Sequence, residues 1–477
     1  MISLTIDPTL DYPEGSAGYS PDEAFPEYTF QELSSIKNPV YRAVRELFIQ
    51  AELDREHLGT PDWNPLGKWI TPGSKVFVLC NFANERRATE TVMDFRSRCT
   101  HGSVIRAVTD YILIATGNTG CVSFGNSPTQ VCQWGQVLKD TGADEVQQFY
   151  QAHGKPVKAC DLRLFVLDTT SLGAVRGVER RDESGGVHIN LGSDSLLAEL
   201  DNRTEQRFRV MNYSPLRTQA FHSAGKHEYV VNRQILDADV IVSIPKLKTH
   251  EKVGISCALK GFVGTVGHKD SLPHHRYGSP VKGGDEYPDP ANIFQRFSTV
   301  FHETIQKTSP DHAWGSLLRA ANRILKRSIR SYTPVIEGAW WGNDTAWRMV
   351  LDLVRIATYC SKDGVMQEKP CRKQLALIDG IYGGEGEGPA YCTAVHCGVL
   401  LFGDNLPAID SLNAALMGFD PSKIPLIQRA FTLKKYPLET QLLGEETKQE
   451  NLAAGKPEHA CAQFKPSDGW KERLASQ

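Results

Sequence analysis

Short apolar runs bounded by polar or turn residues recur along the chain, and they alternate with stretches whose apolar residues have helical spacing. Most of these runs do not alternate polar with apolar residues, which is typical of strands that are buried on both faces. We therefore predict an α/β fold with a largely parallel or mixed sheet covered by helices, and with a helical insertion. The predicted strands are 75–80, 120–124, 162–168, 239–244, 375–379 and 395–403, and the predicted helices are one capped by Ser103 and those at 314–330, 345–359 and 407–417.

The pattern changes towards both ends of the chain. Residues 1–60 are rich in Pro, Asp, Glu and Tyr, and we expect them to form an extension laid over the core. Residues 61–430 are expected to hold the α/β core, with the helical insertion at about 288–365. From residue 431 the chain becomes polar, and residues 431–477 are predicted to be a mobile tail.

Composition and charge narrow the class of protein. The net charge of the 477 residues is −3, so no overall field attracts the chain to nucleic acid or to an anionic membrane. The sequence has no apolar stretch long enough to span a membrane, and its start does not resemble a secretory signal. The eleven cysteines are scattered and form no Cys-x-x-Cys pair. We expect a cytoplasmic protein with reduced thiols, whose partner is a small anionic molecule; the oligomeric state stays open.

Lysines and histidines gather directly after the predicted strand at 239–244. In open α/β sheets, ligands bind beyond the carboxyl ends of the strands, so Lys246 and Lys248 are predicted to bind an anionic substrate. Lys260 lies among small and apolar residues, where lost solvation would make its amine more nucleophilic. We predict that Lys260 is catalytic, together with His250 and His275, which would transfer protons or bind a metal ion. The alternative is a set of surface charges that merely flank the end of a strand.

A second stretch of interest is rich in glycine and follows the predicted strand at 375–379. Its sequence, from Asp379-Gly380 to Gly-Glu385-Gly-Glu-Gly-Pro389, suggests a flexible loop that holds a carboxylate near a ligand. Glu385 is predicted to contact the substrate, and Asp379 to join His250 and His275 as a metal ligand. A tight loop with solvated glutamates is the alternative.

Two polar residues near the start of the core complete the predicted site. Asn81 follows the first predicted strand, and His101 precedes the helix that Ser103 begins. Both are predicted to face the substrate from the same edge of the sheet. For His101, an ordinary position at the start of a helix is an equal alternative.

These motifs resemble the family of the domain of unknown function 362. The resemblance rests on Ala238-Asp-Val-Ile-Val-Ser-Ile-Pro-Lys-Leu-Lys-Thr-His250, Ala258-Leu-Lys-Gly-Phe-Val-Gly264, the Asp379-Gly380 pair with its glycine-rich continuation, Leu416-Met-Gly-Phe-Asp420 and the segment from Thr100-His101. It covers residues from about 68 to 426. Some members of that family carry ferredoxin-like cysteine runs, which this sequence lacks, so no iron–sulfur cluster is expected.

The chain is also distantly similar to the nickel-pincer lactate racemase family. Those enzymes have a histidine, a lysine that anchors the cofactor and a further histidine, and His250, Lys260 and His275 follow one another in that order. Their lysine follows Ser-Gly-Gly, whereas Lys260 follows Cys257-Ala-Leu259. The resemblance implies a divalent metal or a lysine-linked organometallic cofactor, and the cofactor stays open.

Together these features favour an enzyme that acts on a small anionic or carbohydrate-like substrate through a Lys/His site, with an isomerase of the racemase or epimerase type as the best single hypothesis. The alternatives are a non-catalytic protein that binds an anion or metabolite, and a redox protein.

Overall fold

The protein is described from a computed structural model. The structure describes residues 1–15, 17–117, 119–169, 175–180, 185–203, 207–210, 213, 215–307, 333, 335–438 and 463–474.

A mixed sheet forms the centre of the molecule, and most of its described strands run parallel. Along the sheet, β4 (Val157–Asp161), β3 (Cys121–Asn126), β2 (Lys75–Cys80), β11 (Val240–Ile244) and β15 (Lys373–Glu387) are parallel neighbours. Next to β15, β16 (Tyr391–Gly403) and then β1 (Ile2–Ile6) are antiparallel. β12 (Lys246–His250) also pairs with β15 in parallel, and β13 (Gly254–Ser256) pairs with β12 in antiparallel. The predicted α/β class with a largely parallel or mixed sheet is confirmed.

The order of the parallel strands creates a topological switch point in the sheet. The chain moves outwards from β2 to β3 and β4, and later returns to place β11 on the other side of β2. Loops that leave the carboxyl ends of β2 and β11 therefore diverge, and in open α/β sheets ligands bind at such a point.

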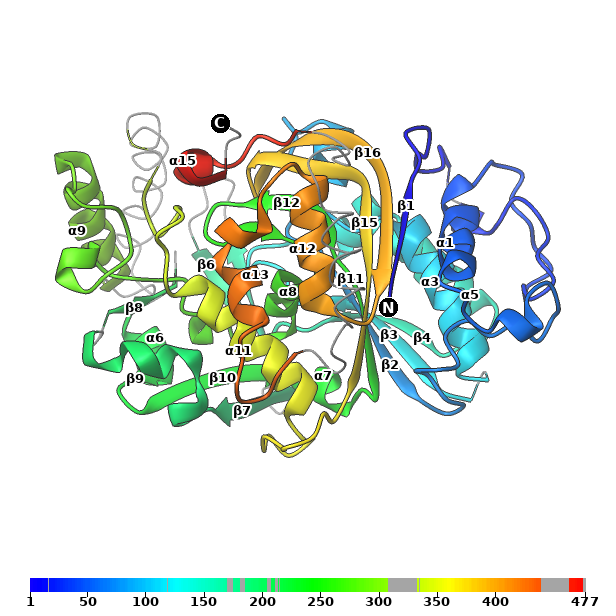
Figure 1. The fold of residues 1–477 in the computed structure, drawn as a ribbon, viewed down its shortest axis with the longest axis horizontal. Helices are drawn as coiled ribbons and strands as arrows, with labels where there is room; N and C mark the ends of the chain where they lie inside the picture. The colour runs from blue at the N-terminus through cyan, green and yellow to red at the C-terminus, as the bar shows by residue number, and fades with distance from the viewer. Residues whose placement is uncertain are drawn as a thin grey trace.

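Helices cover both faces of the sheet (Figure 1). One face carries α1 (Pro39–Gln50), α3 (Gly102–Ala115), α4 (Trp134–Thr141) and α5 (Ala143–Ala152), and the other carries α8 (Ala258–Gly261), α11 (Ala346–Tyr359), α12 (Leu406–Leu416) and α13 (Pro425–Ala430). The residues of β2 divide between the two cores: Val76 and Val78 pack with α3, whereas Phe77 and Leu79 belong to the core that contains α11. Successive side chains of a strand point to opposite faces, so a strand buried on both sides is apolar throughout.

Smaller elements surround the core. They are α2 (Val92–Arg96), the ribbon of β5 (Phe165–Thr169) and β6 (Val175–Arg180), the sheet of β7 (Gly186–Asn190), β10 (Lys226–Asn232) and β9 (His222–Ser223), the pair of β8 (Phe208–Arg209) and β14 (His275–Arg276), and the helices α6 (Pro215–Phe221), α7 (Arg233–Asp237), α9 (Ile293–Lys307) and α15 (Lys471–Leu474). None of the helices that the structure describes has the length and apolar character needed to cross a bilayer.

Most predicted elements are confirmed. The strand at 75–80 is β2, the strands at 120–124 and 239–244 match β3 and β11 within two residues, and the helices at 345–359 and 407–417 are α11 and α12. The predicted helix at 314–330 lies outside the described residues.

The strand predicted at 162–168 is confirmed only in part: residues 165–168 belong to β5, whereas residues 162–164 form the connection from β4 to β5. β4 ends at Asp161 and β5 begins at Phe165. Between them the Arg163 side chain turns back to bind Asp161, with Nη2 and Oδ2 2.6 Å apart, and its Nη1 donates to the carbonyls of Thr129 and Cys132. Because Arg163 has apolar residues on both sides, the sequence pattern did not indicate that the strand is interrupted here.

The glycine-rich loop predicted after residue 379 is also wrong. β15 continues to Glu387 and pairs with β16 over most of its length. The end of the chain contributes as well: Phe464, Trp470 and Leu474 from the segment predicted as a polar tail are buried.

Candidate functional site

The strand β12 carries the predicted anion-binding lysines. The sequence suggested that the chain leaves the sheet at Pro245, but it continues at once as β12 along β15. Lys246, Lys248 and His250 occupy alternate positions of β12 and form a row along it, with a shift of register against β15 between Lys246 and Lys248. Leu247 packs into the core. All three members of the row are buried.

Lys246 lies at one end of this row and is paired inside the protein. Its Nζ lies 2.9 Å from Asp379 Oδ1 and donates to the hydroxyl oxygen of Tyr12 at 2.8 Å. The Tyr12 hydroxyl in turn donates to Asp379, and the backbone N–H of His101 donates to the second carboxylate oxygen at 3.1 Å. Burial lowers the pKa of Lys246, and the charge of Asp379 opposes that shift. Because protein groups occupy Asp379 in this way, the arrangement is an internal ion pair.

His101 lies next to this ion pair and contacts two of its residues, Asp379 and Tyr12. It caps α3, with the N–H of Ser103 donating to its Nδ1 at 3.2 Å. Its ring stacks on Tyr12 with the centroids 4.0 Å apart. Burial, and after it the charges of Arg96 and Lys246, hold the pKa of His101 well below its usual range, so the imidazole is neutral. His101 therefore meets Asp379 and Tyr12.

The other end of the row opens into a set of cationic and imidazole side chains, which we call the lysine–histidine cluster. The cluster consists of Lys248, His250, Lys252, Lys260, Lys269 and His274. Its members are close enough to act on one another electrostatically. The charge of Lys260 lowers the pKa values of His250 and His274, and the charges of Lys248 and Lys252 lower that of Lys260. The predicted proximity of Lys260 to His250 is therefore present.

The lysines of the cluster differ in their hydrogen bonding. Lys248 Nζ donates to the carbonyl of Arg98 at 2.8 Å, Lys269 Nζ donates to that of Ser127 at 2.7 Å, and Lys252 Nζ donates to that of Glu337. Lys260 has no hydrogen-bond or ion-pair partner among the described residues. Its side chain is half-buried, as is that of His274. Lys260 thus presents an amine that the surrounding protein leaves unused.

The protonation of the cluster follows from burial and like charge. Burial, followed by the charges of Lys248 and Lys252, lowers the pKa of Lys260 to about 7. Burial lowers the pKa of His274 to about 3, and also lowers that of His250 well below its usual range. Near pH 7 the cluster therefore combines neutral imidazoles with an amine that is partly neutral.

A buried carboxylate fixes the short helix that carries Lys260. The N–H groups of Ala258 and Leu259, at the start of α8, donate to the two oxygens of Asp410 at 2.7 and 3.1 Å. Burial raises the pKa of Asp410 to about 7. Asp410 lies in α12, so the start of α8 is capped by a residue of another helix. No local pattern could indicate this pairing, because the partners lie 152 and 151 residues apart.

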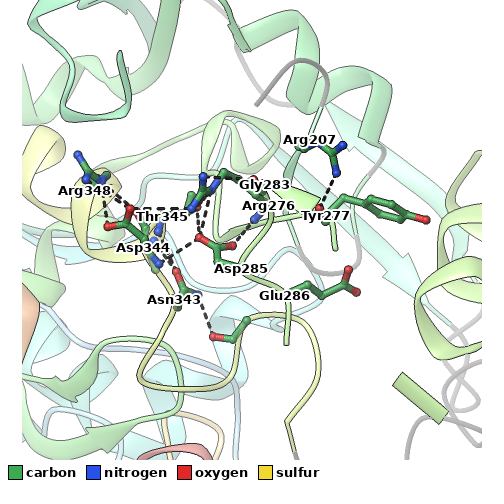
Figure 2. A network of polar contacts seen from close by, with 12 residues as sticks. Arg207, Arg276, Tyr277, Gly283, Asp285, Glu286, Asn343, Asp344, Thr345 and Arg348 are labelled. Carbon is green, nitrogen blue, oxygen red and sulfur yellow. Dashed lines mark hydrogen bonds and ion pairs between the residues drawn. The ribbon is translucent and has the colours of Figure 1, made fainter. Parts of the chain in front are cut away.

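His274, and not its neighbour His275, joins Lys260. The segment is fixed by a network around Asp285, shown in Figure 2: the backbone N–H of Arg276 donates to Asp285 at 2.5 Å, and the Thr345 hydroxyl donates to it at 2.6 Å. Asn343 Nδ2 donates to the carbonyl of His274 at 2.9 Å. His275 pairs with Arg209 between β14 and β8, and its pKa is lowered by burial and then by Lys252. Neighbouring residues of an extended segment face opposite ways, which separates the two imidazoles.

Unpaired polar atoms lie at the carboxyl ends of β2 and β3. Asn81 Oδ1, Asn126 Oδ1 and Ser127 Oγ are buried without a hydrogen-bond partner among the described residues. Ser127 also supplies the carbonyl that holds Lys269, and Gly264 packs against Asn126. Buried polar groups are normally satisfied, so these atoms mark a position where water or a ligand is needed.

Glu385 serves a different purpose from the predicted one. Its carboxylate accepts the backbone N–H of Lys465 at 2.9 Å and pairs with the Nζ of Lys465 at 3.2 Å. The neighbouring Glu387 accepts the N–H of Asp468 at 2.7 Å. The two glutamates thus attach the C-terminal segment to β15.

The predicted metal ligands do not converge. Asp379 is bound to Lys246 and Tyr12, and His275 lies against Lys252 and Gly338. In the part of the chain that the structure describes, no three His, Cys, Asp or Glu side chains are grouped to hold a metal ion. A hollow of about 410 Å³ lined by Trp69, Ser74, Asp239 and Lys373 opens at the amino ends of β2, β11 and β15, at the opposite edge of the sheet.

Comparison with known proteins identifies a family. No curated protein and no solved structure matches the chain. The resemblance to lactate racemases is therefore not shown. The model of a family described as a domain of unknown function, DUF362, matches residues 157–415, which is more than half of the chain and includes the whole lysine–histidine cluster. The chain belongs to the DUF362 family.

Proposed function

We propose that this protein is an enzyme that binds a small anionic substrate at the lysine–histidine cluster and moves a proton on it, as an isomerase of the racemase or epimerase type does. The observation that carries the proposal is the unpaired amine of Lys260 beside two neutral imidazoles.

The charges of the cluster favour an anion. The side chains that act on Lys260 are Lys248 and Lys252, and both are cationic. A carboxylate or phosphate next to these groups would relieve their mutual repulsion. It would also raise the pKa of Lys260, so binding near pH 7 to 8 would take up protons.

The same groups are suited to proton transfer. A base works best when its pKa lies near the working pH, and the pKa of Lys260 is about 7. His250 and His274 are neutral, and their lowered pKa values mean that either imidazole would readily release a proton that it had received. A reaction that removes a proton from one side of a carbon and returns it to the other requires two such groups.

Deuterium exchange tests this proposal. The purified protein is incubated in D₂O with small hydroxy acids, sugar acids and sugar phosphates, and exchange of a carbon-bound hydrogen is followed by NMR. We expect exchange with at least one of these anions, and its loss in Lys260→Met. The exposed Lys282 supplies the control variant Lys282→Met. A Lys260→Met protein that exchanges at the wild-type rate would contradict the proposal.

A non-catalytic anion-binding protein is the second candidate, favoured by the lysines that meet around Lys260. In that case no substrate would exchange deuterium. Lys248→Ala and Lys252→Ala would weaken anion binding in a salt-dependent way, whereas His250→Ala would leave the affinity nearly unchanged.

A further inference from the structure

We propose that Lys260 is a nucleophile that condenses with a carbonyl group of the substrate, and that the substrate is therefore a small anion bearing an aldehyde or ketone, such as a 2-oxo acid or an aldehyde phosphate. This inference rests on the proposed function and names the substrate class of the same site.

The first support is the availability of the amine. Lys248, Lys252 and Lys269 each use Nζ to bind a backbone carbonyl. Lys260 has no such acceptor among the described residues. A lysine that stabilised the fold would be expected to have an acceptor, because a buried ammonium group without one is costly. Lys260 is also only half-buried, so part of its side chain is in contact with solvent.

The second support is the arrangement around the amine. Lys248 and His250 approach from β12, Lys252 from the segment after it, and His274 from the segment before β14. Lys269, in the 3₁₀ turn Lys269–Ser271, lies close enough for the charge of Lys260 to lower its pKa. These neighbours are cations or neutral imidazoles. They favour the neutral, nucleophilic form of Lys260, and they attract the charged end of an anionic carbonyl compound.

The chemistry balances without any further reagent. The lone pair of Lys260 Nζ attacks the carbonyl carbon, the C=O π bond breaks, and a proton transferred from nitrogen to oxygen gives a carbinolamine. Loss of water then forms the C=N bond. His250 and His274 are the neutral groups placed to carry these protons. The resulting imine withdraws electrons from the neighbouring carbon, whose proton becomes easier to remove, which is the step that an isomerase needs.

Reductive trapping tests the inference on the full chain. The protein is incubated separately with glyoxylate, pyruvate and glyceraldehyde 3-phosphate in the presence of cyanoborohydride, which reduces an imine irreversibly. Peptide mass mapping then gives the rate of modification at Lys260 and, in the same sample, at the exposed Lys282. Because both rates come from one folded protein, the comparison does not depend on a variant that folds.

With at least one of the three compounds, we expect Lys260 to be modified at least about tenfold faster than Lys282 at pH 7, because an ordinary lysine with a pKa near 10.4 is almost fully protonated there. The ratio should fall as the pH approaches 9. In Lys260→Arg, which keeps the charge but not the nucleophile, the adduct should be absent while Lys282 reacts as before. Modification of Lys260 no faster than that of Lys282 with all three compounds would overturn the inference. If deuterium exchange were still observed in that case, only the imine would be excluded, and the proposed proton transfer would stand.

Discussion

The lowered pKa of Lys260 affects the stability of the folded protein. The pKa of Lys260 is lowered to about 7 in the folded protein, below the value of about 10.4 expected for an unfolded chain. Between these two values the unfolded chain binds more protons, so the contribution of Lys260 to the free energy of unfolding rises with pH across this window. Near pH 7 the amine therefore destabilises the fold.

Replacing Lys260 with methionine is expected to stabilise the protein. At pH 7 the free energy of unfolding of Lys260→Met should exceed that of the wild type by on the order of 1–3 kcal/mol, after allowance for partial exposure, and the difference should shrink towards pH 10. Urea unfolding at several pH values measures this, with Lys282→Met as the control. An unchanged or lower stability at pH 7 would show that the amine has a partner and is not held free for chemistry.

In contrast to the loss of Lys260, the loss of one partner from the ion pair of Lys246 and Asp379 is expected to destabilise the protein. Neither side chain is exposed to solvent, and Asp379 also accepts from Tyr12 and from the backbone of His101. Asp379→Asn should lower the free energy of unfolding by about 3–5 kcal/mol, because it leaves the Lys246 ammonium buried without its counter-charge. The control is Asp404→Asn, which breaks a partly exposed pair with the N-terminus and should cost at most about 1 kcal/mol. Equal losses in the two variants would contradict this interpretation.

The sequence identified some of these residues and missed others for physical reasons. Lys248, His250 and Lys260 stood out because polar residues after a buried strand fall at a ligand-binding edge. Tyr12 could not be found, because it meets Asp379 from a position 367 residues away. The sequence also could not show that His274, and not His275, lies beside Lys260. Which of these two neighbours faces Lys260 depends on the pairing of β14 with β8.

At the level of elements, β15 shows where local patterns fail. Glycine weakens an isolated strand, so a run of glycines indicates a loop. In the fold, the glycines of β15 make room for neighbours: a Cβ on Gly380 would lie 3.0 Å from the Val399 carbonyl oxygen, and one on Gly384 would lie 2.9 Å from Cys392 Sγ. The buried parallel strands β2, β3 and β11, which have no such requirement, were predicted within two residues.

The short helix α8 is expected to depend on Asp410. Asp410→Ala removes the acceptor of two buried N–H groups and should lower the free energy of unfolding by about 1–3 kcal/mol. Amide exchange of residues 258–261 should become faster, and the selective modification of Lys260 should be lost. Asp410→Asn, which keeps one acceptor oxygen, should retain part of both properties. Unchanged modification of Lys260 in Asp410→Ala would show that α8 is positioned by other contacts.

For the whole molecule, both ends of the chain converge on the elements that build the site. β1 pairs with β16 at the edge of the sheet, and Tyr12 then reaches the ion pair of Lys246 and Asp379. Towards the other end, the backbone N–H of Trp341 donates to the carbonyl of Gly469 at 3.1 Å. This hydrogen bond joins the C-terminal segment to the chain before α11. The predicted extension and tail thus take part in the same core.

Trp470 provides the test of this convergence. Its indole is 1% exposed, its Nε1 donates to the Glu251 carbonyl at 2.8 Å, and its ring packs against Gly254, so it supports the turn that carries Lys252. Trp470→Ala should lower the free energy of unfolding by about 3–5 kcal/mol and weaken anion binding, because the turn loses both its packing and its hydrogen bond. Trp470→Phe should restore most of the packing but not the hydrogen bond. The matched control is Trp341→Ala, whose side chain is 38% exposed and should cost much less. Urea unfolding and calorimetric titration with phosphate measure the two effects; if Trp470→Ala bound phosphate as the wild type does, the C-terminal segment would support the fold without shaping the site.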